Sequence, residues 1–210
     1  RYKLRLIEDA SEALGSFYKK KHLGTYGDIG VLSFNGNKII TTGGGGAVIT
    51  NNKKFAEKVY SLSNISKIPH SFEFLYKEIG FNYRMPSLNA SLGRSQLKKI
   101  NFFLNKKRNN FKFYSKIFLN SKNFRIFCEN KFSKSNYWLN SLILNKPNKR
   151  LRNMILKKAN LNGLKLRPIW KSLDRFNYLK SYPKMDLSNS RKLEMSVINL
   201  PSSASLKFEK

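Results

Sequence analysis

The stretch SFNGNKIITTGGGG, residues 33–46, is the most informative part of the chain, and Lys38 stands near its middle. An apolar run over 29–34 predicts a strand that leads into this stretch, and a β-branched run over 47–50 predicts a strand that leaves it. Lys38 is therefore expected in a non-periodic connection between two strands. A lysine in such a connection is held in place by the structure around it and is not merely solvated.

The chemistry of Lys38 has two interpretations. A lysine amine is a poor nucleophile while it is protonated, but it condenses with carbonyl groups when it is desolvated or lies next to another cation. Lys38 could therefore form a Schiff base. Alternatively, Lys38 is one solvated residue in a chain that carries 41 lysine and arginine residues. The segments around it decide between these interpretations.

Four segments resemble, in order and spacing, the DegT/DnrJ/EryC1/StrS sugar aminotransferases. They are IEDASEALGS (7–16), GTYGDIGVLSFNGNK (24–38), TTGGGGAVITN (41–51) and GFNYRMPSLNASLG (80–93). Milder similarity continues through SNYWLNSLIL, RPIW and NLPSS. The resemblance implies the cofactor pyridoxal 5′-phosphate (PLP) and an α/β fold of the PLP-dependent transferase fold type I, which is the aspartate aminotransferase-like fold.

Two positions indicate a subgroup within this family. Many members carry a histidine after the SF pair and an acidic residue inside the glycine run, where this chain has Asn35 and Gly44. Together with the SNYWLN and RPIW segments, these departures resemble the aminotransferases of the legionaminic-acid pathway (the LegC-like subgroup) and related bacterial surface-sugar pathways.

The resemblance also implies roles for individual residues. Lys38 would bind the cofactor covalently, and Asp9 would face the pyridine nitrogen, whose pKa a nearby carboxylate raises. Glu12 would lie near the ring hydroxyl, and Ser33 would donate a hydrogen bond to the cofactor phosphate. Asn82 would reach the cofactor phosphate of the neighbouring subunit, which implies a homodimer with shared active sites.

The residues before the lysine motif also allow an interpretation from local pattern alone. The apolar run over 4–7 predicts a buried parallel strand, and Glu8, Asp9 and Glu12 follow it. Ligands of open α/β sheets lie beyond the carboxyl ends of the strands, so a pocket is expected there. Without the resemblance, a helix start is the simpler interpretation, with Asp9 as the N-cap and Glu12 in the capping-box position.

Three further residues are candidates for the substrate site. Arg84 could hold a phosphate or sugar group, or it could bridge the subunit interface. Arg167 and Trp170 could line the sugar site, or they could pack their own domain. The glycine run over 43–46 matches neither phosphate-loop pattern, so it is expected to be a turn with positive φ or with a backbone close to the cofactor.

The hydrophobic periodicity predicts the remaining elements. Helices are expected over 52–62, 88–119 and 149–160, an irregular aromatic segment over 63–78, and short strands over 137–144, 166–170 and 197–200. We therefore divide the chain into the C-terminal part of a large PLP-binding domain (1–97), a connecting helix (98–120) and a small α+β domain (121–210).

The formal net charge of +29 suggests anionic partners. Nucleic acid or an anionic membrane would attract such a chain, but the lysines and arginines are scattered and never form a block of five or six. We therefore expect no nucleic-acid binding as the main function, while a nucleotide-linked substrate would still be attracted. No apolar run approaches the ~20 residues that span a bilayer, so no membrane insertion is expected.

The cysteine and histidine content bears on the cellular compartment and on metal binding. Cys128 is the only cysteine, which permits no internal disulfide and suits a reducing compartment, so a cytoplasmic location is expected. His22 and His70 lack partners at ligand spacing, so no metal site is expected. The chain starts at Arg1, and family members carry much of the large domain before the IEDA segment, so we expect a C-terminal portion.

The leading functional hypothesis is PLP-dependent transamination of a nucleotide-linked 4-keto-6-deoxy sugar, with Lys38 as general base and acid. The resemblance suggests glutamate as amino donor and bacterial surface polysaccharide or nonulosonic acid biosynthesis as the context. In a dehydratase branch of the family a histidine replaces the lysine, so Lys38 favours transamination. The alternatives are a catalytically silent fragment that acts only by interaction and a basic nucleic-acid-binding domain.

Overall fold

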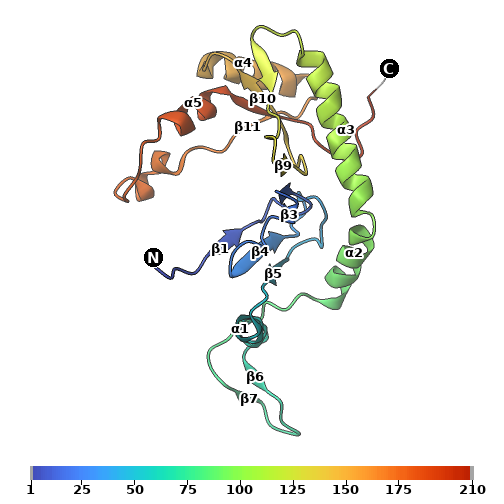
Figure 1. The fold of residues 1–210 in the computed structure, drawn as a ribbon, viewed down its shortest axis with the longest axis vertical. Helices are drawn as coiled ribbons and strands as arrows, with labels where there is room; N and C mark the ends of the chain where they lie inside the picture. The colour runs from blue at the N-terminus through green and yellow to red at the C-terminus, as the bar shows by residue number, and fades with distance from the viewer. Residues whose placement is uncertain (1, 209–210) are drawn as a thin grey trace. The chain divides into compact units, whose positions relative to one another are not determined.

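The computed structural model describes residues 2–208 (Figure 1). They form two compact units. The first comprises the described part of Arg1–Leu104 together with Asn130–Trp138, and the second comprises Asn105–Glu129 together with the described part of Leu139–Lys210. Segment Asn130–Trp138 thus returns to the first unit. Along residues 2–208, none of the helices is long and apolar enough to cross a membrane.

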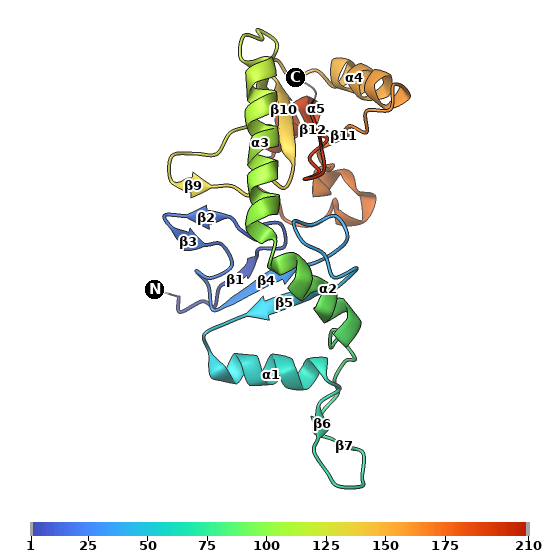
Figure 2. The same cartoon turned by 90° about the vertical axis from the view of Figure 1, so that its right-hand side faces the viewer.

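A three-stranded sheet in the order β1-β4-β5 lies at the centre of the first unit (Figure 1 and Figure 2). Its strands are β1 (Ile7–Asp9), β4 (Ile29–Ser33) and β5 (Gly46–Ile49). β1 is parallel to β4, with Ile7 opposite Ile29, whereas β5 is antiparallel to β4, with Ser33 opposite Gly46. The two strands predicted on either side of the lysine stretch are confirmed, and so is the parallel pairing of the first strand.

The prediction that this first strand is buried is wrong. Leu4, Leu6 and Ile7 are 83%, 54% and 63% exposed, and the strand begins at Ile7 and not at residue 4. Within residues 2–208, β1 pairs only with β4 and therefore lies at an edge of the sheet. A short apolar run predicts extended backbone, but it does not reveal whether another element lies on its far side.

Backbone hydrogen bonds fold the connection between β4 and β5 back on itself. The amide of Phe34 donates to the carbonyl of Gly45, and the amide of Thr42 donates to the carbonyl of Phe34, both at 2.9 Å. Gly43 and Gly45 have φ of +80° and +115°, which confirms the positive φ expected in the glycine run. The bonds close a loop that carries Lys38, as the non-periodic sequence predicted.

Helix α2 (Ser87–Leu97) holds this loop from one side. Asn89 Nδ2 donates to the carbonyl oxygen of Thr42 at 2.6 Å. Gly93 allows the helix to approach closely, because a Cβ atom at this position would lie 2.6 Å from Cγ2 of Thr42. Thr42 is only 2% exposed, so this end of the loop is packed as tightly as a core residue.

Helix α1 (Lys53–Ser63) follows β5, and it confirms the helix predicted over 52–62 to within one residue at each end. Asn52 caps it by accepting a hydrogen bond from the amide of Phe55. The segment expected to be irregular contains a hairpin of β6 (Lys67–Ile68) and β7 (Leu75–Tyr76).

The single helix predicted over 88–119 is two helices, α2 and α3 (Ile100–Phe118). Lys98 keeps right-handed helical dihedrals (φ −59°, ψ −24°), and its amide donates to the carbonyls of Arg94 and Gln96. Because the backbone stays nearly helical at the break, the apolar periodicity continues through it. The pattern therefore gave no sign of the interruption.

A second small sheet in the first unit was not predicted. It has the order β3-β2-β9, from β2 (Phe17–Tyr18), β3 (Lys21–His22) and β9 (Ser133–Lys134). Lys19 and Lys20 form the turn between β2 and β3 with φ of +44° and +68°. Such turns normally carry glycine or asparagine, so this pair of lysines gave no turn signal.

The second unit is built on an antiparallel sheet in the order β11-β12-β10-β8. The strands are β8 (Phe124–Ile126), β10 (Asn140–Leu144), β11 (Arg167–Pro168) and β12 (Val197–Leu200). Helix α4 (Lys149–Leu161), helix α5 (Ser188–Ser196) and the short 3₁₀ turns η1 (Leu173–Arg175) and η2 (Asn177–Leu179) complete this unit with most of α3. The apolar core consists of Leu142, Leu144, Leu166, Ile198 and Leu200.

Two of the predicted elements of this unit agree closely with the structure, and two are shorter than expected. The helix over 149–160 and the strand over 197–200 are confirmed. The strand expected over 137–144 begins only at Asn140, because Tyr137 has a positive φ of 46° that interrupts extended backbone. The strand expected over 166–170 is limited to two residues.

Candidate active site

The amine of Lys38 is enclosed by two side chains of the first unit. Its Nζ forms an ion pair with the carboxylate of Glu12. On another side it lies 4.7 Å from the centroid of the Trp138 ring, within cation–π distance. The Lys38 side chain is 12% exposed, whereas that of Glu12 is 49% exposed. The lysine is therefore held by specific contacts, as its position between two strands predicted.

Asp9 ends β1 and carries a carboxylate that is held ionised. Its Oδ1 accepts hydrogen bonds from the Ser11 hydroxyl at 2.5 Å and from the Ser11 amide at 3.1 Å. These bonds, foremost that from the hydroxyl, lower the pKa of Asp9, and the positive charge of Lys38 lowers it further. No helix follows Asp9, because residues 10–16 form turns, so the helix-start interpretation is wrong.

Glu8, which the sequence placed near the same pocket, is engaged by a neighbouring loop. Its carboxylate accepts backbone hydrogen bonds from Gly24 at 2.8 Å, Tyr26 at 2.5 Å and Gly27 at 2.6 Å. Partial desolvation raises the pKa of Glu8, but the three amides together outweigh it, so that the pKa is lowered overall. Glu8 therefore fastens this loop to the end of β1.

The segment Asn130–Trp138 brings two residues to the site that the sequence did not identify. Trp138 Nε1 donates to the carbonyl oxygen of Asn37 at 2.6 Å, directly before the lysine. Asn136 Nδ2 donates to the carbonyl oxygens of Glu12 at 2.6 Å and of Leu14 at 3.0 Å. A tryptophan and an asparagine two residues apart, within the SNYWLN segment, were the only available signal.

The remaining cofactor candidates of the first unit lie in different places. Ser33 ends β4 opposite Gly46, and its Oγ accepts the amide of Asn35 at 3.4 Å. Asn82 is exposed and forms an isolated backbone bridge with Asn64. The structure thus brings Lys38, Glu12 and Asp9 together, whereas Asn82 lies on the segment between the hairpin and α2.

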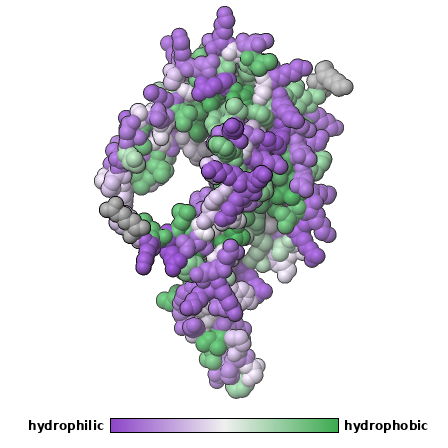
Figure 3. Space-filling model, viewed as in Figure 1, coloured by the Kyte–Doolittle hydropathy of each residue, from purple (hydrophilic) through white to green (hydrophobic). Residues whose placement is uncertain are grey.

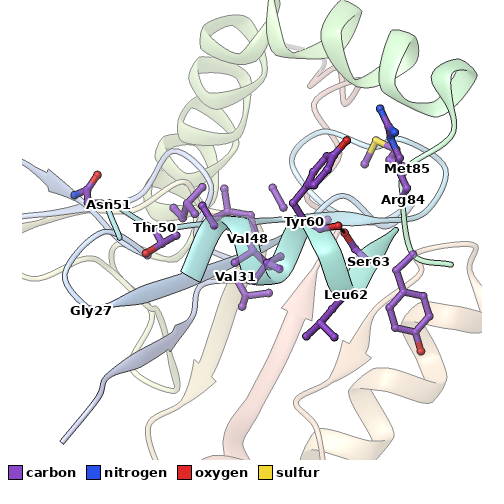
Figure 4. Close-up of a pocket in the computed structure, with 18 of the residues that line it drawn as sticks. Gly27, Val31, Val48, Thr50, Asn51, Tyr60, Leu62, Ser63, Arg84 and Met85 are labelled. Carbon is purple, nitrogen blue, oxygen red and sulfur yellow. Dashed lines mark hydrogen bonds between the residues drawn. The ribbon is translucent and has the colours of Figure 1, made fainter. Parts of the chain in front are cut away.

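Arg84 lies beside a cleft of about 980 Å³ between the sheet and α1 (Figure 4). Val31 and Val48 from the sheet line it, together with Val59 and Tyr60 from α1. The Arg84 guanidinium lies 5.9 Å from the Tyr60 ring centroid. The lining does not include Lys38, and most of it is apolar side chains and backbone. This cleft is therefore a mainly apolar space between the sheet and α1, and the ionisable residues around Lys38 lie elsewhere.

Arg167 and Trp170 belong to the second unit. Arg167 donates to Oδ1 of Asn160 and to the carbonyl oxygen of Leu166, both at 3.2 Å. Trp170 is 67% exposed. These contacts give Arg167 a local structural role, and a role of either residue in a sugar site stays a prediction.

The candidate side chains of the first unit fit PLP in their chemistry. A lysine amine matches its aldehyde, the ionised carboxylate of Asp9 matches a protonated pyridine nitrogen, and the Ser33 hydroxyl is a donor for a phosphate oxygen. Across residues 2–208, no three or more His, Cys, Asp or Glu side chains form a group that could hold a metal ion. The amine of Lys38, the carboxylate of Asp9 and the hydroxyl of Ser33 form a donor set that suits an organic cofactor with an aldehyde and an acidic group.

Comparison with known proteins shows the family to which the chain is similar. The profile of the DegT/DnrJ/EryC1/StrS aminotransferase family matches residues 1–210. GDP-perosamine synthase of Escherichia coli O157:H7 is 35% identical over 209 residues, covering 98% of this chain and 55% of that protein. UDP-4-amino-4,6-dideoxy-N-acetyl-beta-L-altrosamine transaminase of Campylobacter jejuni (strain 81-176) is 33% identical over 147 residues, covering 69% and 39%.

A solved structure is similar over nearly the whole chain. PseC of Helicobacter pylori, an aminotransferase involved in the biosynthesis of pseudoaminic acid, superposes with a TM-score of 0.91 at 29% identity. The superposition covers 97% of this chain and 56% of that one. The chain thus spans about half the length of the relatives it matches.

The α/β fold of fold type I that the motifs implied is confirmed by these structural neighbours. Aminotransferases of this family use PLP, in agreement with the donor set around Lys38. The family profile covers every residue of the sequence, and Lys38 lies between the two strands that the apolar runs predicted. The chain belongs to the DegT/DnrJ/EryC1/StrS aminotransferase family.

Proposed function

We propose that this chain carries the catalytic lysine of a PLP-dependent aminotransferase that acts on a nucleotide-linked 4-keto-6-deoxy sugar. The observation that carries the proposal is the enclosure of the Lys38 amine, which is paired with Glu12 and covered by the Trp138 ring. A lysine that is only a solvated surface residue does not require these contacts. The sequence motif around Lys38 and the contacts of its amine therefore support the same role.

The residues of the site have separate tasks in this proposal. When bound, PLP supplies an electron sink for a carbanion at the substrate carbon. Asp9, whose pKa is lowered, remains an anion at neutral pH and holds a proton on the pyridine nitrogen. Lys38 would act as the general base and acid that moves a proton away from the substrate carbon. Glu12 pairs with the Lys38 amine and would lie near the ring hydroxyl of PLP, and Ser33 would bind its phosphate.

The substrate class rests on the relatives and on charge. The Campylobacter jejuni relative is named for a 4-amino-4,6-dideoxy sugar carried by a nucleotide, which is the product expected from a 4-keto-6-deoxy precursor. The net charge of +29, with hydrophilic residues over much of the face in Figure 3, favours an anionic nucleotide sugar. Arg84, Arg167 and Trp170 are our candidates for its binding.

The narrower assignments rest on sequence resemblance. The legionaminic-acid pathway rests on Asn35, Gly44 and the SNYWLN and RPIW segments, and the glutamate donor rests on family resemblance alone. The place of the reaction would be the biosynthesis of a bacterial surface polysaccharide or a nonulosonic acid, in the cytoplasm. The domain division at residues 97 and 120 is part of the same proposal.

A homodimer with shared active sites completes the proposal. Phe72, Phe74 and Ile79, in and beside the β6-β7 hairpin, are 82%, 77% and 88% exposed, which favours a partner surface in this region. Asn82 follows that hairpin and is itself exposed, so it is available to reach a cofactor phosphate of the partner subunit.

The proposal is tested by locating the lysine that binds the cofactor. The protein carrying this chain is incubated with PLP, reduced with borohydride and digested, and the modified peptide is identified by mass spectrometry. We expect the adduct on Lys38, its loss in Lys38→Ala and its retention in Lys54→Ala, a control at an exposed position of α1. An adduct spread over many lysines would contradict the proposal. The complete absence of an adduct would favour a fragment that acts only by interaction.

A further inference from the structure

Two loops that carry the ion pair of the site are joined by a third segment. Glu12 stands in the turns after β1, and Lys38 stands in the connection after β4. Both loops accept hydrogen bonds from the segment Asn130–Trp138, which is distant in sequence but belongs to the same compact unit. β9 anchors the start of this segment by pairing with β2, with Lys134 opposite Phe17.

Asn136 fixes the loop that carries Glu12. It is 4% exposed, and besides the two carbonyl contacts of its Nδ2, its backbone amide donates to Ser16 Oγ at 3.0 Å. Its Oδ1 accepts the amide of Trp138 at 2.9 Å, so the asparagine side chain is used at both of its polar ends. A buried amide group with this many partners fixes the backbone on both sides of it.

Trp138 fixes the loop that carries Lys38. The indole N–H donates to the carbonyl of Asn37, and Nζ of Lys38 lies over the face of the ring. One side chain therefore contacts both the backbone before the lysine and the lysine amine. Tyr137, between the two anchoring residues, has φ of +46°, which is unfavourable for a residue with a side chain. The segment accepts this conformation between the asparagine and tryptophan that make these contacts.

We propose that Asn136 and Trp138 are positioning residues for the catalytic lysine: the segment Asn130–Trp138 clamps the Glu12 and Lys38 loops, and the indole of Trp138 forms one wall of the place that receives the lysine amine. This inference rests on the proposed function of Lys38. In this inference Trp138 positions Lys38 and does not itself bind the cofactor. Trp138→Phe is the sharpest variant, because it retains an aromatic ring while it removes the N–H donor to Asn37 together with one ring of the indole.

The experiment measures covalent attachment and cofactor affinity separately. In the protein carrying this chain, the rate at which PLP becomes attached to Lys38 is followed by quenching with borohydride at timed intervals. Trp138→Phe should lower that rate about three- to ten-fold, as expected for the loss of one hydrogen bond. Trp138→Ala should lower it further. Tyr182→Phe, at a 63% exposed ring of the second unit, is the control and should leave it unchanged.

The same substitution is then made in the Lys38→Ala background. There the dissociation constant of PLP, measured by equilibrium dialysis, should be the same with and without Trp138→Phe, because the lysine that the indole positions is gone. An equal weakening of cofactor binding in this background would overturn the inference, since Trp138 would then act on PLP itself. An unchanged attachment rate for Trp138→Phe in the protein that retains Lys38 would also overturn it.

Folding and function are controlled independently. Each variant is compared with the parent protein by thermal unfolding, and Asn136→Ser serves as a second, milder variant that shortens the clamp on the Glu12 loop. It should lower the attachment rate in the same direction as Trp138→Phe, and an unchanged rate would count against the clamp. If the parent protein itself gains no adduct at Lys38, the proposed function fails. If the parent protein gains the adduct but Trp138→Phe does not change its rate of formation, only the inference about Trp138 fails.

Discussion

β12 and β1 are both short strands with apolar sequences, yet their surroundings are opposite. β12 lies between β11 and β10, all four of its residues are buried, and Ile198 is 0% exposed. β1 has β4 on one side only, and Ile7 is 63% exposed. The burial of a strand is thus decided by its neighbours, and of these two strands only β12 has a paired strand on both sides within residues 2–208.

The two units are consequently stabilised in different ways. The second has an apolar core centred on Ile198, with α4 and part of α3 packed against it. Around β1, the first unit instead relies on polar contacts: the carboxylate of Glu8 binds three amides, and Asn136 holds the turns near Glu12. Apolar burial responds to the volume of a side chain, whereas these polar contacts respond to charge and hydrogen-bonding capacity.

The largest expected effect is at the two isoleucines. Ile198→Ala should lower the free energy of unfolding by about 3–4 kcal/mol, because it leaves a cavity in a closed core. Ile7→Ala should lower it by less than about 0.5 kcal/mol, as at other exposed positions. Urea unfolding of both variants of the protein carrying this chain measures the difference. A cost at Ile7 comparable with that at Ile198 would break the comparison, because it would mean that β1 is covered in that protein.

The next effect tests the polar side of the comparison. Glu8→Gln removes the charge that three backbone amides share, and it should lower the free energy of unfolding by about 2 kcal/mol, since hydrogen bonds to charged groups are the stronger ones. Glu57→Gln is the matched control, because Glu57 forms only a 3.9 Å exposed pair with Lys53. Equal stabilities of the two variants would show that the Glu8 contacts do not hold the loop.

The same contrast explains what the sequence could predict. Motifs carry information about the residues inside them, and so the strands around Lys38 were predicted correctly. The structure also places Asp9 close to Lys38, and the roles of these two residues in one site stay predictions. Trp138 was missed because it reaches the lysine loop across a separation of 101 residues, and nothing local marks such a contact. The role of Glu8 was not predicted because its partners are backbone amides, which every residue except proline carries.

The helices show a similar limit. α4 was predicted because its apolar residues recur at helical spacing, whereas α5, with the sequence SNSRKLEMS, has too few apolar residues to show a period. The interior of α5 is stabilised by tertiary contacts instead, since the carbonyl of Glu194 accepts a bond from the Arg152 guanidinium. Local pattern therefore succeeds for elements whose own residues bury an apolar face.

A buried lysine gives the second unit a stability that depends on pH. Lys107 is 7% exposed, its Nζ donates to the carbonyl of Ser202 at 2.7 Å, and burial lowers its pKa from 10.5 to about 8. Between pH 8 and pH 10.5 the unfolded chain therefore binds more protons than the folded one, so the free energy of unfolding rises with pH in this window. The rise should be about 1–2 kcal/mol, less than the full shift gives, because the hydrogen bond offsets part of the burial.

Lys107→Met isolates this contribution. It keeps the length and the apolar stem of the side chain and removes the titrating group, so its unfolding free energy should lack the rise found in the parent protein. Urea unfolding at pH 7.5, 9 and 10.5 measures both profiles, with Lys112→Met as the control at another position of α3. Parallel profiles for the parent protein and Lys107→Met would show that Lys107 does not titrate as its burial requires.

The smallest effect compares two helix caps of the same residue type. Asn148 caps α4 by accepting the amide of Leu151 at 2.9 Å, and Asn52 caps α1 by accepting the amide of Phe55 at 3.3 Å. Asn148→Ala should lower the free energy of unfolding by about 1 kcal/mol and Asn52→Ala by about 0.5 kcal/mol, because the longer bond is the weaker one. α4 also packs on a closed core, whereas α1 has no buried residue. Fraying of the first turn of α1 therefore disrupts less of the structure than fraying of the first turn of α4.

Urea unfolding resolves this difference only in paired measurements, and glycine variants at both positions control for backbone conformation, since glycine is itself a tolerated N-cap. A larger cost at Asn52 than at Asn148 would reverse the ranking. Together with a large cost at Ile7, it would place a covering element on the first unit, against both β1 and α1.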